Sequence, residues 1–206
     1  MIMPTPYLNF VIGLLVSFLG TLPLGVLNIT IMDVSIKKGI NAALRFAMAC
    51  ALVEFVYSYI SVQLTRSIID FPALRPITEV FATITLLGMG VYYIRKQSGL
   101  SESKQKSVSS FYLGTLLSIL NVVAFPFWIL YTTLLQGKGL IGLSEQGLIM
   151  IYVLGISLGT IAGLLPFVYG SHFLTRLVNV HQHRMDRLIG SLFIFLSLCQ
   201  FISVWV

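Results

Sequence analysis

Charged residues are scarce in this chain of 206 residues. Only 10% of its residues are Asp, Glu, Lys or Arg, and 57% are hydrophobic, whereas soluble domains carry roughly 25% charged residues. Residues 1–32 contain no charged side chain, and several apolar runs reach the length of about 20 residues that a helix needs to cross a bilayer. The composition therefore excludes a soluble globular protein and predicts an all-α integral membrane protein with one membrane domain, residues 1–206.

Cysteine and enzymatic motifs are scarce as well. Cys50 and Cys199 occur in different apolar runs and form no CxxC pair, so both are expected to be buried thiols. The chain has no Gly-rich phosphate loop and no nucleophile–base pair. His181 and His183 form an HxH pair near Asp186, but this pair alone does not make a zinc site. We therefore expect no enzyme, no cofactor, no metal site and no ATP-driven transport.

Six apolar runs, each too long for a membrane β-strand, are predicted to be transmembrane helices. The connectors after the first, third and fifth runs carry ten of the thirteen Lys and Arg residues. Basic connectors face the cytoplasm, so both termini are expected outside. The same distribution favours the lipid bilayer, and not a nucleic acid, as the partner. The predicted spans are 7–32, 41–64, 75–94, 110–136, 147–171 and 188–206.

The two halves of the chain resemble each other. A first repeat over residues 1–97 and a second over 109–206 flank the polar linker 98–108, expected to be flexible and cytoplasmic. Three spans per half give the halves opposite orientations, as in the inverted repeats of secondary transporters. An offset of 101 residues aligns matching residues near the start of each half. They are Gly13, Ser17 and Leu19 with Gly114, Ser118 and Leu120.

Both leading spans contain helix-breaking residues. Pro23, Gly25 and Asn28 interrupt the first apolar run, and Asn121 and Pro126 interrupt the fourth. Proline removes a backbone donor, and unpaired backbone groups are tolerated at membrane depth only beside protein or a wet cavity. The two breaks are therefore predicted to line a solute site near the midplane. The asparagines could instead bond the carbonyl groups that the breaks release.

Glu54 lies near the middle of the second apolar run, where a charged side chain is costly and usually faces the bundle interior. It could contact a cationic solute group or carry a coupling proton, or it could be a buried structural acid. Cys50 and Tyr57 share its helical face, and Tyr57 completes the predicted solute site. Gly155, Gly159 and Gly163 predict a close helix contact, either inside the bundle or across a homodimer.

These motifs resemble the LysE/RhtB superfamily of bacterial amino-acid exporters, which have six spans. The family's Pro-Gly-Pro-Asn motif, basic turn with glycine and acidic position correspond to Pro23, Gly25, Asn28, Lys37, Lys38, Gly39 and Glu54. Its Phe-x-x-Gly run and Asn-Pro-Lys-Ala motif correspond to Phe111, Gly114, Asn121 and Ala124. The chain departs from these motifs at Val26, Val122 and Val123.

This resemblance implies a multi-pass protein of the bacterial plasma membrane. It would export an amino acid or a similar small solute, driven by the proton motive force. Two other functions remain open on the sequence alone. A thiol–disulfide relay would need Cys50 and Cys199 to meet, and a membrane scaffold would use the glycine stripe as a docking face.

Overall fold

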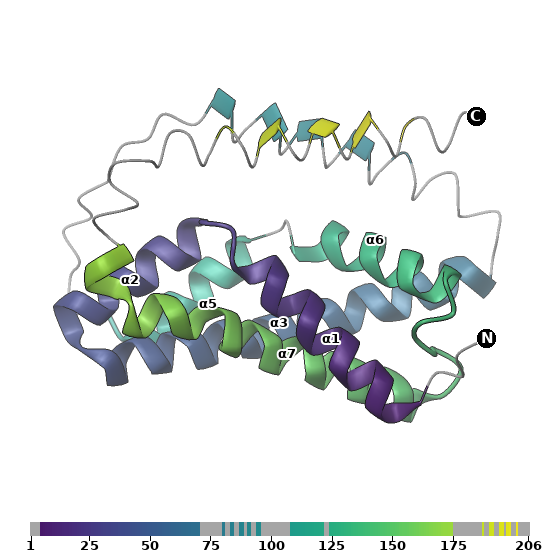
Figure 1. The fold of residues 1–206 in the computed structure, drawn as a ribbon, viewed down its shortest axis with the longest axis horizontal. Coiled ribbons are helices and arrows are strands. Elements are labelled where there is room, and N and C mark those ends of the chain that lie inside the picture. The colour runs from purple at the N-terminus through teal and green to yellow at the C-terminus, as the bar shows by residue number, and fades with distance from the viewer. Residues whose placement is uncertain are drawn as a thin grey trace.

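The computed structural model describes residues 5–70, 108–121 and 124–174, with some residues of the stretches 80–95 and 187–201. Within this part of the chain every regular element is a helix, as the composition predicts (Figure 1). Connector residues His181, His183 and Asp186, and the linker up to Ser107, lie outside it. The helices are α1 (Pro6–Thr21), α2 (Val26–Lys38), α3 (Ile40–Asp70), α5 (Ser110–Leu120), α6 (Ala124–Gly137) and α7 (Gln146–Tyr169).

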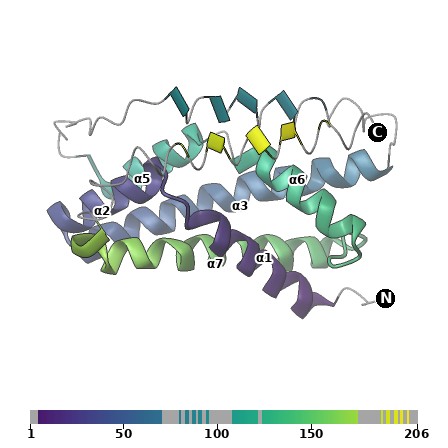
Figure 2. The same cartoon turned by 45° about the horizontal axis from the view of Figure 1, so that its top comes forward.

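Helices α3 and α7 lie along the long axis of the bundle, where they pack side by side in antiparallel directions (Figure 2). Gln63 near the end of α3 bonds Gln146 at the start of α7, with Nε2 and Oε1 3.2 Å apart. Helices α1 and α2 pack on α7, and α5 and α6 pack on α3. Helices α1, α5 and α6 thus lie against the long helix of the other half, whereas α2 contacts both long helices.

The glycine stripe of α7 lies against α1. A methyl group added at Gly155 would overlap the backbone of Phe10, and one added at Gly159 would overlap that of Leu14. Gly163 meets Thr21 in the same way. The predicted close helix contact is therefore inside the bundle, so the stripe is not exposed to a docking partner.

Both leading spans are broken, as Pro23 and Asn121 predict, but neither is a single kinked helix. Helices α1 and α2 meet at an angle of 78°, and α5 and α6 at 64°. Expected as one helix over 7–32, the first run is instead two helices, the second ending at Lys38. Pro126 lies in the first turn of α6, where an N–H has no helical partner, so it opens that helix instead of breaking it.

Two apolar clusters fill the bundle, one toward each end. The first, at the end where α3 begins, consists of buried Ile31, Met32, Val34, Ala43, Phe46, Ala47, Cys50, Leu164, Phe167 and Val168. The second, at the other end, consists of Val62, Ala124, Trp128, Ile141, Leu143, Ile149, Tyr152, Val153 and Ile156. Glu54 lies on α3 between the parts of that helix that enter the two clusters.

Among the described helices, α3 and α7 are each long and apolar enough to cross a membrane, and the count reaches four if each bent pair is one span. The predicted spans 75–94 and 188–206 lie largely outside the described residues. Their described residues are helical and touch, because a methyl group at Gly90 would lie 2.9 Å from the carbonyl oxygen of Gly190. Six spans and an inverted repeat remain predictions.

Candidate functional site

The two broken spans meet in the middle of the bundle. A methyl group added at Gly20, at the end of α1, would lie 2.9 Å from Cζ of Phe127 in the first turn of α6. Gly20, just before the first break, therefore touches the ring of Phe127, just after the second one. The structure brings together the two breaks that the sequence predicts as a pair.

The side chain of Asn28 caps the end of α1 at the first break. Its side-chain amide donates to the carbonyl oxygens of Thr21, at 2.7 Å, and Pro23, at 3.3 Å. Both carbonyl groups lie where α1 ends, and Asn28 is only 4% exposed. Of the two roles open to Asn28 on the sequence, the structure places it in the capping one, at the edge of the break.

Helix α3 supports the second break. Tyr57 Oη donates to the carbonyl oxygen of Ile119 at 2.6 Å, and Ser61 Oγ donates to that of Phe125 at 3.2 Å. Helix α5 ends at Leu120, so the carbonyl of Ile119 has no partner within the helix. Asn121 caps α5 through its backbone N–H, and its side chain makes no hydrogen bond to another described residue.

Glu54 is bonded by an aromatic residue of the second break. Trp128 in α6 donates its indole N–H to Oε1 of Glu54. Trp128 is 1% exposed, and its ring meets those of Phe127 and Tyr152 edge to face at 5.0 and 6.5 Å. The carboxyl group is thus partly buried beside the break and held by a donor at the start of α6.

The predicted solute-site residues thus fall into two adjoining groups. Pro23, Gly25 and Asn28 form the first break, and Glu54 and Tyr57 contact the second, which contains Asn121 and Pro126. Sequence reasoning missed two further contacts, Trp128 on Glu54 and Ser61 on the backbone of α6. Ser61 follows Glu54 by seven residues and so shares its helical face, a spacing that could have revealed it. Nothing in the sequence pairs Trp128 with Glu54.

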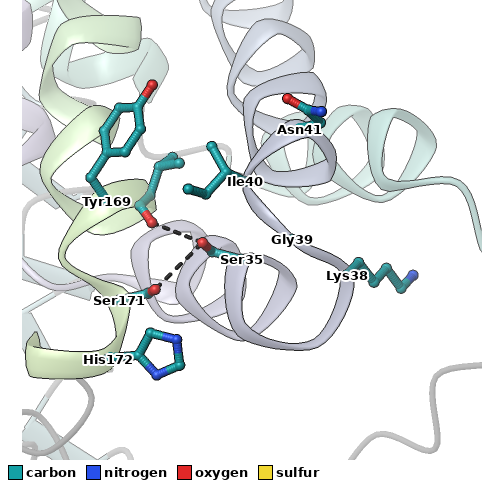
Figure 3. Close-up of a pocket in the computed structure, with 9 residues that line it drawn as sticks. Ser35, Lys38, Gly39, Ile40, Asn41, Tyr169, Ser171 and His172 are labelled. Carbon is teal, nitrogen blue, oxygen red and sulfur yellow. Dashed lines mark hydrogen bonds between the residues drawn. The ribbon is translucent and has the colours of Figure 1, made fainter.

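A pocket of about 400 Å³ lies elsewhere, where α2 and α7 end and α3 begins (Figure 3). None of the predicted solute-site residues lines it. Ser35 in its wall donates to the carbonyl oxygen of Val168 at 2.8 Å, and Ser171 lies 3.4 Å from Ser35. The lining residues are Ser35, Lys38, Gly39, Ile40, Asn41, Val168, Tyr169, Ser171 and His172.

Several other polar groups bind structural partners, whereas the buried oxygens Ser118 Oγ and Gln136 Oε1 have no hydrogen-bond partner among the described residues. Asn9 is fully buried and exchanges hydrogen bonds with the backbone of Gly142, which fixes the loop before α7. Ser17 and Thr160 bond each other at 2.9 Å within the contact between α1 and α7. Asp33 pairs with Lys37 at the surface. In the described part of the chain no three His, Cys, Asp or Glu side chains gather as a metal site would require.

The chain matches one known family over most of its length. The profile of the LysE type translocator family aligns with residues 18–203. This match confirms the resemblance that the motifs around Pro23, Glu54 and Asn121 indicate. No curated protein and no solved structure matches the chain.

Proposed function

Because the chain belongs to the LysE type translocator family, we propose that this membrane transporter exports amino acids or similar small solutes across the bacterial plasma membrane. The observation that carries the proposal is the meeting of the two broken spans at Gly20 and Phe127, with Glu54 beside them. Broken helices that face each other inside an apolar bundle are the way secondary transporters build a solute site.

In this proposal the solute amine binds Glu54. No other acidic side chain is described between the two apolar clusters, so the carboxyl group gives this level of the bundle its cation preference. An arriving ammonium group competes with the indole N–H of Trp128 for the same oxygen. Tyr57 and Pro126 shape the wall around it.

The solute carboxylate binds at the first turn of α2. This helix begins at Val26, and no side chain caps its N-terminus, because the N-cap residue is Gly25. The first N–H groups of a helix have no partner within it and favour an anion.

Export against a gradient needs an energy source, and we propose proton exchange at Glu54. The carboxyl group would hold either a proton or the solute amine, so one proton enters as one solute leaves. The distribution of Lys and Arg residues supports an orientation with the connector at Lys37 and Lys38 in the cytoplasm, and export as the direction of transport rests on the family resemblance.

The test is efflux from proteoliposomes loaded with labelled amino acids, with and without a pH gradient. Glu54→Gln keeps an oxygen that can accept from Trp128 but holds neither charge nor proton, so gradient-driven efflux should be lost. Arg45→Gln is the matched control, since Arg45 is exposed two turns before Glu54 on the same helix. Efflux by Glu54→Gln that follows the pH gradient as the wild type does would refute the role of Glu54.

A further inference from the structure

The pocket at one end of the bundle is walled by the ends of three helices. Helix α2 ends at Lys38, α7 ends at Tyr169, and α3 begins at Ile40. Figure 3 shows Ser35 and Ser171 facing each other in the wall, while the side chain of Lys38 points away from them. The pocket lining combines the polar groups of Ser35, Asn41, Ser171 and His172 with apolar surface from Ile40, Val168 and Tyr169, which suits a small molecule that has both a polar and an apolar part.

One hydrogen bond holds α2 against α7 at this pocket. Ser35 Oγ donates to the carbonyl oxygen of Val168 at 2.8 Å and lies 3.4 Å from Oγ of Ser171. Ser35 is 7% exposed and Ser171 3%, so both hydroxyl groups are enclosed. These contacts of Ser35 add to the apolar packing of α2 against α3 and α7.

The first apolar cluster lies between the pocket and the broken spans. Ile31 and Val34 of α2 are fully buried there against Phe46 of α3 and Leu164 of α7. From Asn28 at the break to Ser35 at the pocket, α2 rises about 10 Å over seven residues. The same short helix thus borders the proposed solute site at one end and the pocket at the other, with an apolar seal between them.

Helix α2 has a glycine at each end, whereas its neighbour α1 packs closely along α7. Pro23 and Gly25 lie in the bend before α2, and Gly39 after it has a φ of 86°, a conformation that glycine adopts readily. By contrast, α1 packs backbone to backbone on Gly155 and Gly159 of α7. Movement of α2 alone would open the seal and leave the contact between α1 and α7 intact.

We propose that this pocket is the inner mouth of the solute path, and that the contacts of Ser35 with Val168 and Ser171 close it. The inference rests on the proposed export function. A small amine-bearing solute enters the pocket from the side of Lys37 and Lys38, α2 swings away from α7, and the path to Glu54 opens. Re-formation of the Ser35 contacts then prevents the solute from returning.

The test links the positions of Ser35 and Ser171 through a reversible disulfide. Ser35→Cys with Ser171→Cys, in a chain with Cys50→Ala and Cys199→Ala, places two thiols where hydroxyl oxygens lie 3.4 Å apart, so a small approach of the two side chains would bring the sulfur atoms to the disulfide distance of about 2 Å. Oxidation should stop most efflux from proteoliposomes, and reduction should restore it. Ser17→Cys with Thr160→Cys is the matched control, because it joins α1 to α7 at a contact that does not move. Its efflux should be the same oxidised and reduced.

Persistent efflux after complete oxidation of the Ser35–Ser171 pair would overturn the inner mouth. Absence of efflux from the wild-type chain would instead contradict the proposed export function. A second measurement, which needs no transport, then tests whether the Ser35 contacts close the pocket. Cys50 lies in the seal and is 1% exposed, so Ser35→Ala should speed its alkylation by N-ethylmaleimide in a Cys199→Ala chain. Ser67→Ala is the control, since Ser67 bonds only within α3. If Ser35→Ala leaves the alkylation rate of Cys50 unchanged, the proposal that Ser35 closes the inner mouth is wrong, whether or not the protein transports the solute.

Discussion

Trp128 in α6 donates its indole N–H to the carboxyl group of Glu54 in α3, and this bond joins the two halves of the chain beside the second break. Glu54 comes from the first predicted repeat and Trp128 from the second. The bond is one of several from α3 to the backbone or side chains around Asn121, together with those of Tyr57 and Ser61. It therefore links the acidic group of the proposed solute site to the position of α6.

This relationship predicts a strong coupling between the two side chains. Trp128→Phe removes the donor and leaves a buried carboxyl oxygen unpaired, which should lower the free energy of unfolding by about 1–3 kcal/mol beyond the loss of packing. In a Glu54→Leu background the same substitution should cost only the packing. Thermal unfolding of the four purified proteins in detergent gives the double-mutant cycle. Additive effects of the two substitutions would contradict the coupling.

The two asparagines should behave differently when replaced by alanine. Asn28→Ala leaves the carbonyl groups of Thr21 and Pro23 without their donor, so unfolding should become easier by about 1–3 kcal/mol. Asn121→Ala removes a side chain with no hydrogen bond to another described residue, so stability should change little. If Asn121 lines the solute path, its replacement should raise the KM for efflux. An Asn121→Ala protein with unchanged transport would remove it from the site.

The contact between α1 and α7 should tolerate no added methyl group. Gly159→Ala would overlap the carbonyl oxygen of Leu14 and force the helices apart, at a cost of about 1–3 kcal/mol. Gly147→Ala is the control in the same helix, because nothing lies within 4 Å of its added methyl group. Alanine is the better helix former, so that control should be neutral or stabilising by up to about 1 kcal/mol. Equal melting temperatures for both variants would contradict the close packing.

Gly39 should be sensitive for a different reason. Its added methyl group would meet nothing within 4 Å, but its φ of 86° and ψ of 167° belong to a region that other residues rarely adopt. Gly39→Ala should therefore cost about 1–3 kcal/mol of backbone strain, measured as a lower melting temperature. Gly137→Ala, equally unobstructed and without a positive φ, should cost far less. Similar losses in the two variants would show that the backbone at Gly39 relaxes.

The parts of the fold that follow from local chemistry could be predicted from the sequence. Pro23 and Gly25 stand two residues apart in one apolar run, and Asn121 and Pro126 interrupt another, so both breaks were predictable. The stripe around Gly159 predicted a close helix contact. Pro166, by contrast, lies inside α7 without ending it. The 78° bend was not predictable, because it depends on how α1 and α2 pack against other helices. The pocket escaped prediction for the same reason. Its walls join Ser35 to Ser171, which are 136 residues apart, and no periodic pattern relates them.

The arrangement of the connectors allows a specific prediction of the orientation in the membrane. Lys38 donates to the carbonyl oxygen of Val108 at 2.9 Å, and Ser35 contacts Ser171. The first connector, the end of the third at Val108 and the start of the fifth at Ser171 therefore lie at one end of the bundle, as positive-inside orientation requires. Asn41 is exposed at this end, and Ser144 is exposed in the loop before α7.

Single cysteines at these two positions test the orientation without changing any charge. In a chain with Cys50→Ala and Cys199→Ala, a membrane-impermeant maleimide should label Ser144→Cys in intact cells. It should label Asn41→Cys only after the membrane is permeabilised. A cytoplasmic control protein with a known cysteine verifies that the cells are sealed. The reverse pattern would place the pocket outside, so that Ser35 would close the exit of the solute path instead of its entrance.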